Sequence, residues 1–224
     1  MNYITNSNTI IFAPEFNDEL EINLITNYTR LIFSDYKLNE RLFNMHNKNE
    51  ECDYLPQGLT HLTLGRSFNQ EVNNLPISLT HLAFGERFNQ EVNNLPQTLT
   101  HLTFGYNFNK EVNNLPQNVK HLKLDCNNQS LVDYLPNSLK ELELSYWFNL
   151  ELNNLPTSIH KIVFYKDSVY DKELNNLPNF VEFLQLPERY NKRILNLPNN
   201  LKTIKCSKKY EYINDFVNFN VQHF

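Results

Sequence analysis

The chain has 224 residues and a formal net charge of −5, so its charge offers no general attraction for nucleic acid. Its hydrophobic fraction of 41% suffices for a thin core, and no apolar run is long enough to cross a membrane. The three cysteines, Cys52, Cys126 and Cys206, do not share a place in the sequence pattern, which favours a reducing compartment over a disulfide framework. We therefore expect a cytoplasmic protein without a cofactor that binds neither nucleic acid nor membranes.

Residues 1–54 look like degenerate copies of a unit that is clearer later in the chain. Ile10 and Phe12, and then Leu31 and Phe33, stand where the later copies have their strand residues. Residues 43–53 are a polar insertion between these copies and the regular ones. We predict a surface loop there, a common place for function on a rigid scaffold.

Residues 55–207 are organised by a repeat. Leu-Pro pairs recur every 20 residues from Leu55 to Leu197, except for an interval of 22 residues between Leu155 and Leu177. Such a period predicts a solenoid of stacked coils rather than one globular core.

Each copy has the pattern of a short strand followed by a turn. Apolar residues two positions apart, such as Leu82 and Phe84, share one face of a strand because side chains alternate. Stacked copies then form a parallel sheet with one face inward. Pro and Gly leave too few residues between them for an ordinary helix. The predicted class is mostly β with little helix.

A second apolar layer follows the turn, with Phe at the same place in four copies and Asn directly after it. We predict a Phe spine beside an Asn ladder whose amides bond main-chain groups. Because Asn is abundant and Gly scarce, we also expect Asn to supply left-handed turns. The phenylalanines and their partners are Phe68, Phe88, Phe108, Phe148, Asn69, Asn89, Asn109 and Asn149.

Residues 208–224 lose the Leu-Pro pattern and are rich in Tyr, Phe and Val. The last coil of a solenoid exposes an open edge, so we predict that this segment is a C-terminal cap.

The motif Leu-x-Phe-Gly-x-x-Phe-Asn, complete at 82–89 and 102–109, resembles the FNIP repeat, a relative of leucine-rich repeats found mostly in social amoebae and giant DNA viruses. The resemblance implies a right-handed leucine-rich-repeat-like solenoid with the sheet on its concave face, acting in protein interaction, in the host cytoplasm if the source is viral. Some relatives carry an F-box, which would imply a substrate adaptor in ubiquitin transfer.

The strand residues between the inward columns must face outward on the concave sheet. We predict that a protein partner binds a monomer there. The candidate residues are His61, Thr63, His81, His101, Thr103, His121, Lys123, Glu141, Glu143 and Lys161. A solvated sheet face without a partner is the competing interpretation.

Four histidines in one column suggest two further uses, metal or small-ligand binding and pH sensing. A straight row does not form a tetrahedron, however, so no metal site is assigned. The chain has no Ser-His-Asp order, Gly-rich phosphate loop, HExxH or CxxC, and we expect no enzymatic activity. The preferred function is a non-enzymatic interaction scaffold; ubiquitin adaptor and His-column ligand binding are the alternatives.

Overall fold

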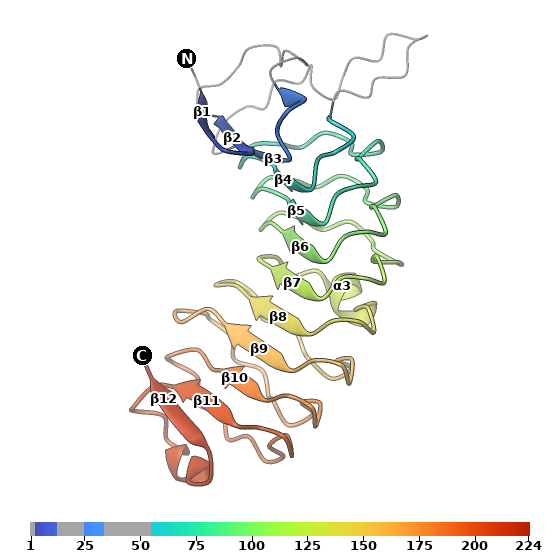
Figure 1. Ribbon diagram of the computed structural model, residues 1–224. Coiled ribbons are helices and arrows are strands. Elements are labelled where there is room, and N and C mark those ends of the chain that lie inside the picture. Colours follow the sequence, from blue (N-terminus) through green and yellow to red (C-terminus); the bar gives the residue numbers. More distant parts are fainter. Residues whose placement is uncertain (1–2, 13–24, 34–54) are drawn as a thin grey trace.

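A computed structural model describes residues 3–12, 25–33 and 55–224 of the chain. These residues form a solenoid in which every coil contributes one short strand (Figure 1). The strands are β1 (Tyr3–Asn6), β2 (Thr9–Phe12), β3 (Arg30–Phe33), β4 (His61–Thr63), β5 (His81–Ala83), β6 (His101–Phe104), β7 (His121–Leu124), β8 (Glu141–Leu144), β9 (Lys161–Phe164), β10 (Phe183–Gln185), β11 (Thr203–Cys206) and β12 (Asn220–His223).

The strands make one sheet in chain order, from β1 to β12. β1 and β2 pair antiparallel, and every later pair is parallel. The 20-residue period keeps equivalent residues opposite each other, so that His61 pairs with His81 and His81 with His101. The predicted parallel sheet of a leucine-rich-repeat-like solenoid is confirmed.

Helix is almost absent from the described residues, as predicted. The coil after β7 contains α3 (Gln129–Asp133), and the last coil contains the 3-10 helix η1 (Ile213–Phe216). No helix in the described part of the chain is both long and apolar enough to span a membrane.

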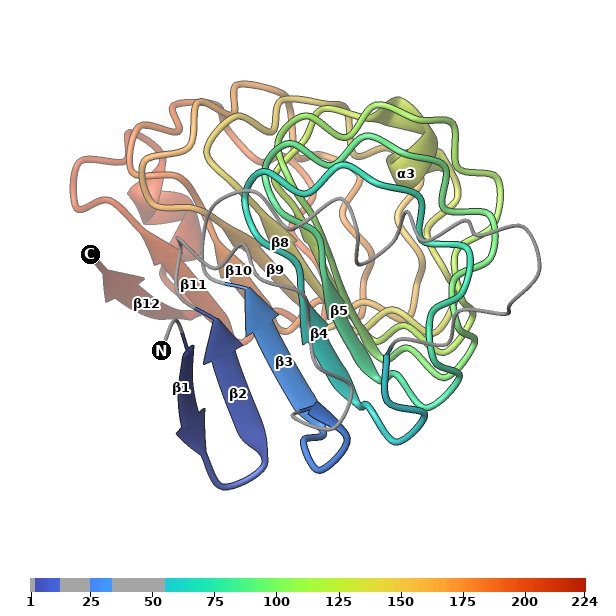
Figure 2. The ribbon, with the colours of Figure 1, turned by 90° about the horizontal axis from the view of Figure 1, so that it is seen from above.

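The sheet lies on the inner side of a curved stack. In Figure 1 the first and last strands bend toward the side that carries the sheet, and the return segments lie on the outer side. Figure 2, which looks down the stack, shows the strands as one wall of the coil with the return segments closing it. The outward face of the sheet is therefore concave.

The core runs the length of the stack as ladders of identical residues. Leu62, Leu82 and Leu102 are at most 2% exposed. The predicted Phe spine is confirmed, because the rings of Phe68, Phe88 and Phe108 repeat at 6.0 Å and lie within 4° of parallel. Further along the stack, Tyr side chains continue the spine after Phe148, at 170, 190 and 210.

The Asn ladder is also confirmed. The side-chain oxygen of Asn69 accepts a hydrogen bond from the backbone N–H of Asn89 at 2.8 Å, and that of Asn89 accepts one from Asn109 at 2.9 Å. The Asn side chain of each coil thus accepts from the next coil's backbone N–H, which would otherwise lack an acceptor within the protein.

The prediction of left-handed turns at Asn is wrong for the described residues. Only Ser7 has a positive φ, and no described Gly does. Asn side chains instead accept hydrogen bonds from the backbone of the next coil. Gly allows the turns of successive coils to pack closely. A Cβ on Gly105 would lie 2.1 Å from the carbonyl oxygen of Gly85.

Both ends join the same sheet. Ile10, Phe12 and Leu31 are fully buried and Phe33 is nearly so, and β2 and β3 keep the parallel register of the regular copies. At the other end, residues 208–224 bury Tyr210 and Phe216 and supply β12. The predicted loop at residues 43–53 lies outside the described residues.

Candidate functional site

The sheet register brings the main predicted site residues into one row on the concave face. From β4 to β9, equivalent positions are directly opposite one another. All six are half-buried, and the inward neighbours on the same strands are buried. The row, here called the His column, consists of His61, His81, His101, His121, Glu141 and Lys161.

The four imidazoles of the His column are stacked face to face. Ring centroids are 3.9 Å apart between His61 and His81, 4.0 Å between His81 and His101, and 4.1 Å between His101 and His121. The planes lie within 14° of parallel. Two adjacent imidazolium ions at this distance would repel by about 4 kcal/mol at an effective dielectric constant of about 20. The stack is therefore suited to neutral rings.

A column of threonines beside the histidines determines which ring nitrogen carries the proton. The hydroxyl oxygen of Thr80 lies 2.8 Å from Nδ1 of His81 and 3.1 Å from the carbonyl oxygen of Thr60. A carbonyl only accepts, so the hydroxyl can make both bonds only if it donates to the carbonyl and accepts from Nδ1–H. The neutral ring then presents Nε2 as an acceptor.

The same arrangement occurs at Thr60 with His61 and at Thr100 with His101. Three successive rungs thus have the same hydrogen-bonding polarity. This arrangement ends at His121, because the residue before it is Lys120 rather than a threonine.

Burial and neighbouring positive charge favour the neutral form of the first three histidines. Burial lowers the pKa of His61, and Arg30 lowers it further. Burial, followed by the charges of His61 and Arg30, lowers the pKa of His81. For His101, burial and then its two histidine neighbours lower the pKa to about 4.

The stacked geometry is unfavourable for a metal ion. The Nε2 lone pairs lie in nearly parallel ring planes about 4 Å apart, so they do not converge on one point. In the described parts of the chain, no group of three or more His, Cys, Asp or Glu side chains is arranged to hold a metal.

The His column ends in a charged cluster. Glu141 Oε2 lies 2.9 Å from Lys161 Nζ and 3.6 Å from His121 Nδ1. Burial by itself would raise the pKa of Glu141, but the hydrogen bond and charge of Lys161 lower it. The cluster is thus a Glu141–Lys161 ion pair at the end of the histidine stack.

The second outward column is less uniform. Thr63 and Thr103 are half-buried, and Glu143 is exposed. The Lys123 amine lies 3.4 Å from Asp125 Oδ1, so it pairs with the residue that follows its own strand rather than across to Glu143, its register neighbour. Glu143 has no ion pair within the described residues and is available to a partner.

Two shallow hollows lie over these columns and share His101 and Thr103. The first, of about 210 Å³, extends from Arg30 over three histidines. The second, of about 150 Å³, extends from His101 to Glu141 and Glu143. Sequence reasoning missed Arg30, which precedes His61 in the register, because the insertion hides the repeat interval there.

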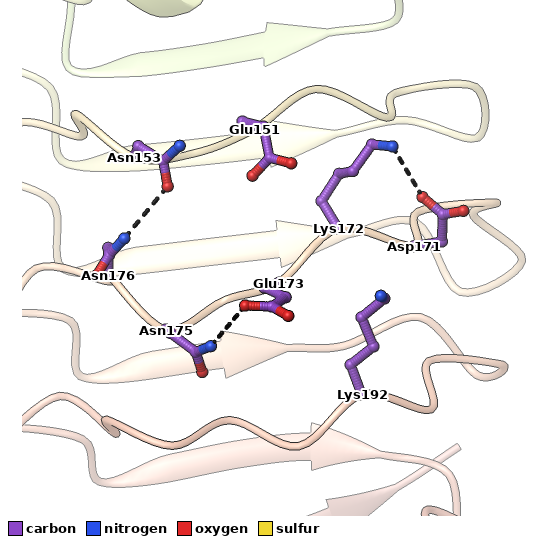
Figure 3. A pocket seen from close by; sticks show the side chains of 8 residues that line it. All are labelled: Glu151, Asn153, Asp171, Lys172, Glu173, Asn175, Asn176 and Lys192. Atoms are coloured by element: carbon purple, nitrogen blue, oxygen red, sulfur yellow. Dashed lines mark hydrogen bonds and ion pairs between the residues drawn. The ribbon is translucent and has the colours of Figure 1, made fainter.

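A third hollow, of about 350 Å³, lies on the return side, where the interval lengthens to 22 residues (Figure 3). Sequence reasoning noted the longer interval but not this hollow. Its polar groups are largely paired with one another, as Asn175 with Glu173 at 2.9 Å and Lys172 with Asp171 at 3.4 Å. It lacks the apolar lining typical of ligand pockets and is not assigned as the site.

The described cysteines are unsuited to nucleophilic chemistry. Cys126 and Cys206 are free and buried, and burial raises the pKa of the Cys126 thiol to about 12. A thiol that stays protonated at neutral pH is a poor nucleophile.

Comparisons with known proteins agree with this architecture. The family model described as "FNIP Repeat" matches residues 46–87, 71–107, 88–127, 108–147 and 127–167, together more than half of the chain. The chain is similar to CroV588, whose crystal structure is described as "a novel circular LRR protein structure", with 31% identity and a TM-score of 0.67. That similarity covers 94% of this chain and 38% of CroV588. The comparison with curated proteins found no match.

Proposed function

Because the chain belongs to the FNIP-repeat family, we propose that it is a non-enzymatic scaffold whose concave sheet face binds a protein partner. Repeat scaffolds of this type present extended concave surfaces suited to another protein. The proposal takes the chain to act as a monomer in the cytoplasm.

The observation that carries the proposal is the continuous pair of hollows along the His column. Together they extend from Arg30 to Glu143 across six strands, a span of about 24 Å at ~4.8 Å per strand. Neutral acceptors lie in the middle, with a positive group at one end and a negative group at the other. A shallow surface of this length fits a folded partner or peptide better than a small substrate, which needs a deeper pocket.

The ubiquitin-adaptor alternative depends on the family resemblance alone. β2 and β3 belong to the same sheet as the regular repeats, which favours degenerate repeats over a helical F-box in that part of the chain.

The test is affinity purification from the native host with mass spectrometry. The first variant changes His61, His81 and His101 to Ser, and the second combines Arg30→Glu with Glu143→Lys, which leaves the stacked rings in place. A matched control changes Glu71, Glu91 and Glu111 to Gln; these exposed residues lie on the return side.

We expect the unmodified chain and the control to retain the same partner, and both concave-face variants to lose it. Thermal unfolding of each variant establishes that it is folded. If the folded charge-reversal variant retained every partner, the concave face would not be the binding surface.

A further inference from the structure

The turns that follow β6, β7 and β8 form a stretch along one edge of the sheet whose one charged residue, Asp125, is paired with Lys123 at 3.4 Å. The two positions after each strand-end turn residue are Tyr106 and Asn107, then Cys126 and Asn127, then Tyr146 and Trp147. The neighbouring turns are charged: Arg66 Nε lies 2.6 Å from Glu86 Oε2 and Lys166 Nζ lies 3.6 Å from Glu188 Oε2, and the exposed Arg87 adds a positive charge in the turn after β5. The six positions themselves carry no charged side chain.

Three aromatic side chains dominate this stretch and are here called the aromatic turn surface: Tyr106, Tyr146 and Trp147. They are 48%, 37% and 51% exposed, respectively. Trp147 meets Tyr146 edge to face, with centroids 4.5 Å apart, and lies 6.2 Å from Tyr106. Clustered, exposed Trp and Tyr are typical of the anchor positions of protein interfaces.

Hydrogen bonds hold this surface in place without a partner. The Asn127 side-chain amide donates to the carbonyl oxygen of Trp147 at 2.7 Å, and its oxygen accepts from the backbone N–H of Asn149 at 2.7 Å. On the other side, the Asn107 N–H donates to the Glu86 carbonyl at 2.9 Å. A partner therefore binds a surface that is already ordered, which lowers the entropic cost of binding.

The hydrogen-bonding capacity of the surface selects a partner rich in acceptors. The Trp147 indole N–H can only donate, and it has no acceptor among the described residues. Proline has a carbonyl acceptor and no N–H, and its ring packs on aromatic faces. A proline-rich segment also matches the absence of charge.

The spacing of the two tyrosines matches the polyproline II helix. Tyr106 and Tyr146 occupy equivalent turn positions two coils apart, which is about 9.6 Å at ~4.8 Å per strand. Three residues of polyproline II at ~3.1 Å rise span about 9.3 Å. Cys126, in the coil between them, is only 1% exposed, and the Trp147 ring lies between the two tyrosines, with centroids 6.2 Å from Tyr106 and 4.5 Å from Tyr146.

We propose that the aromatic turn surface binds an uncharged, proline-rich segment in the polyproline II conformation, lying parallel to the solenoid axis. Prolines three residues apart contact Tyr106 and Tyr146, and a carbonyl between them accepts from the Trp147 indole N–H. This site is separate from the concave face and independent of the function proposed there.

Trp147 is the only tryptophan of the chain, so its fluorescence reports directly on the site. The experiment titrates the full chain with a synthetic decaproline peptide and, separately, with a Gly-Ser decamer. We expect decaproline to shift the emission to shorter wavelength and to protect Trp147 from acrylamide quenching, in a saturable way. The Gly-Ser peptide should do neither.

Variants identify the surface. Tyr106→Ala and Tyr146→Ala should each weaken decaproline binding at least fivefold. The matched control is Tyr134→Ala, which removes a tyrosine that is 51% exposed but lies outside the aromatic turn surface, and it should leave binding unchanged. The concave-face variant Arg30→Glu with Glu143→Lys should also bind decaproline normally, which separates this test from that of the proposed function.

Three results would overturn the proposal. The first is an unchanged Trp147 spectrum at millimolar decaproline. The second is equal weakening by Tyr134→Ala and Tyr106→Ala in variants that unfold at the same temperature. The third is a spectral shift with phosphatidylcholine vesicles but none with decaproline, which would make the surface a membrane contact.

Discussion

The hydroxyl oxygen of Thr100 lies 2.9 Å from Nδ1 of His101. Because the same hydroxyl lies 3.1 Å from the carbonyl oxygen of Thr80, one threonine connects the ring of its own coil to the backbone of the preceding one. The orientation of the concave-face acceptors thus depends on residues that are not themselves candidates for binding.

Thr100→Val is expected to change the tautomer of His101. Without the hydroxyl, Nδ1–H loses its acceptor, and the proton moves to Nε2, where water can accept it. Nitrogen-15 NMR of the imidazole distinguishes the two forms. Stability should fall by about 1 kcal/mol for the lost hydrogen bonds. Thr100→Ser keeps the hydroxyl and should keep both the tautomer and the stability; a valine variant with the original tautomer would disprove the role of Thr100.

Stability should fall as the pH falls from about 6.5 to about 4. The folded chain lowers the pKa of His101 to about 4 from 6.5, so the unfolded chain binds the proton first on acidification, and unfolding becomes easier. After solvent screening the effect of this residue should be on the order of 1 kcal/mol. The negative charge of Glu141 acts in the opposite direction and raises the pKa of His101. Burial and the neighbouring His81 and His121 outweigh it, so the pKa is lowered.

Urea unfolding at several pH values checks this dependence. His101→Gln should show a weaker loss of stability on acidification than the unmodified chain. His160→Gln, which changes an exposed histidine outside the His column, should follow the unmodified chain. Equal pH dependence in all three would mean that His101 titrates normally in the folded state.

Gly105→Ala should destabilise the solenoid by about 1–3 kcal/mol or more, as overpacking does. The new methyl group would lie 2.1 Å from the Gly85 carbonyl oxygen, so the two turns must move apart. Gly58→Ala is the matched control, because no atom of the described part of the chain lies within 4 Å of its added Cβ, and it should be neutral or slightly stabilising. Thermal unfolding compares the two; equal melting temperatures would contradict close packing at Gly105.

Tyr170→Phe and Tyr210→Phe should have opposite outcomes although both residues belong to the same aromatic spine. The Tyr170 hydroxyl is buried and has no hydrogen-bond partner among the residues that the structure describes, so its removal should be neutral or stabilising. The Tyr210 hydroxyl donates to the Lys192 carbonyl at 2.6 Å, and its removal should cost about 1 kcal/mol. Denaturant unfolding measures the difference, and a larger loss for Tyr170→Phe would contradict this assignment.

Much of the fold could be predicted because the repeat period is regular. The alternation of Leu82 and Phe84 predicted the sheet, and the 20-residue spacing placed His61, His81 and His101 in one row. Their face-to-face stacking and common tautomer depend on the threonine before each histidine, which sequence reasoning did not connect to the ring.

Other features could not be predicted because they depend on departures from the repeat. Trp147 and Tyr106 occupy adjacent rather than equivalent turn positions, and their contact across a coil requires the small, buried Cys126 between them. Lys123 lies opposite Glu143 in the register but pairs with Asp125, a choice between near neighbours that spacing alone does not decide.

The Asn ladder also bears on how such a chain can change its length. Between Asn69, Asn89 and Asn109, each joint uses the same acceptor and the same backbone donor. An in-frame gain or loss of one 20-residue unit in the gene would therefore recreate joints already present in the protein. Unequal recombination among these near-identical units could extend or shorten the concave face one rung at a time, with no new contact for selection to optimise.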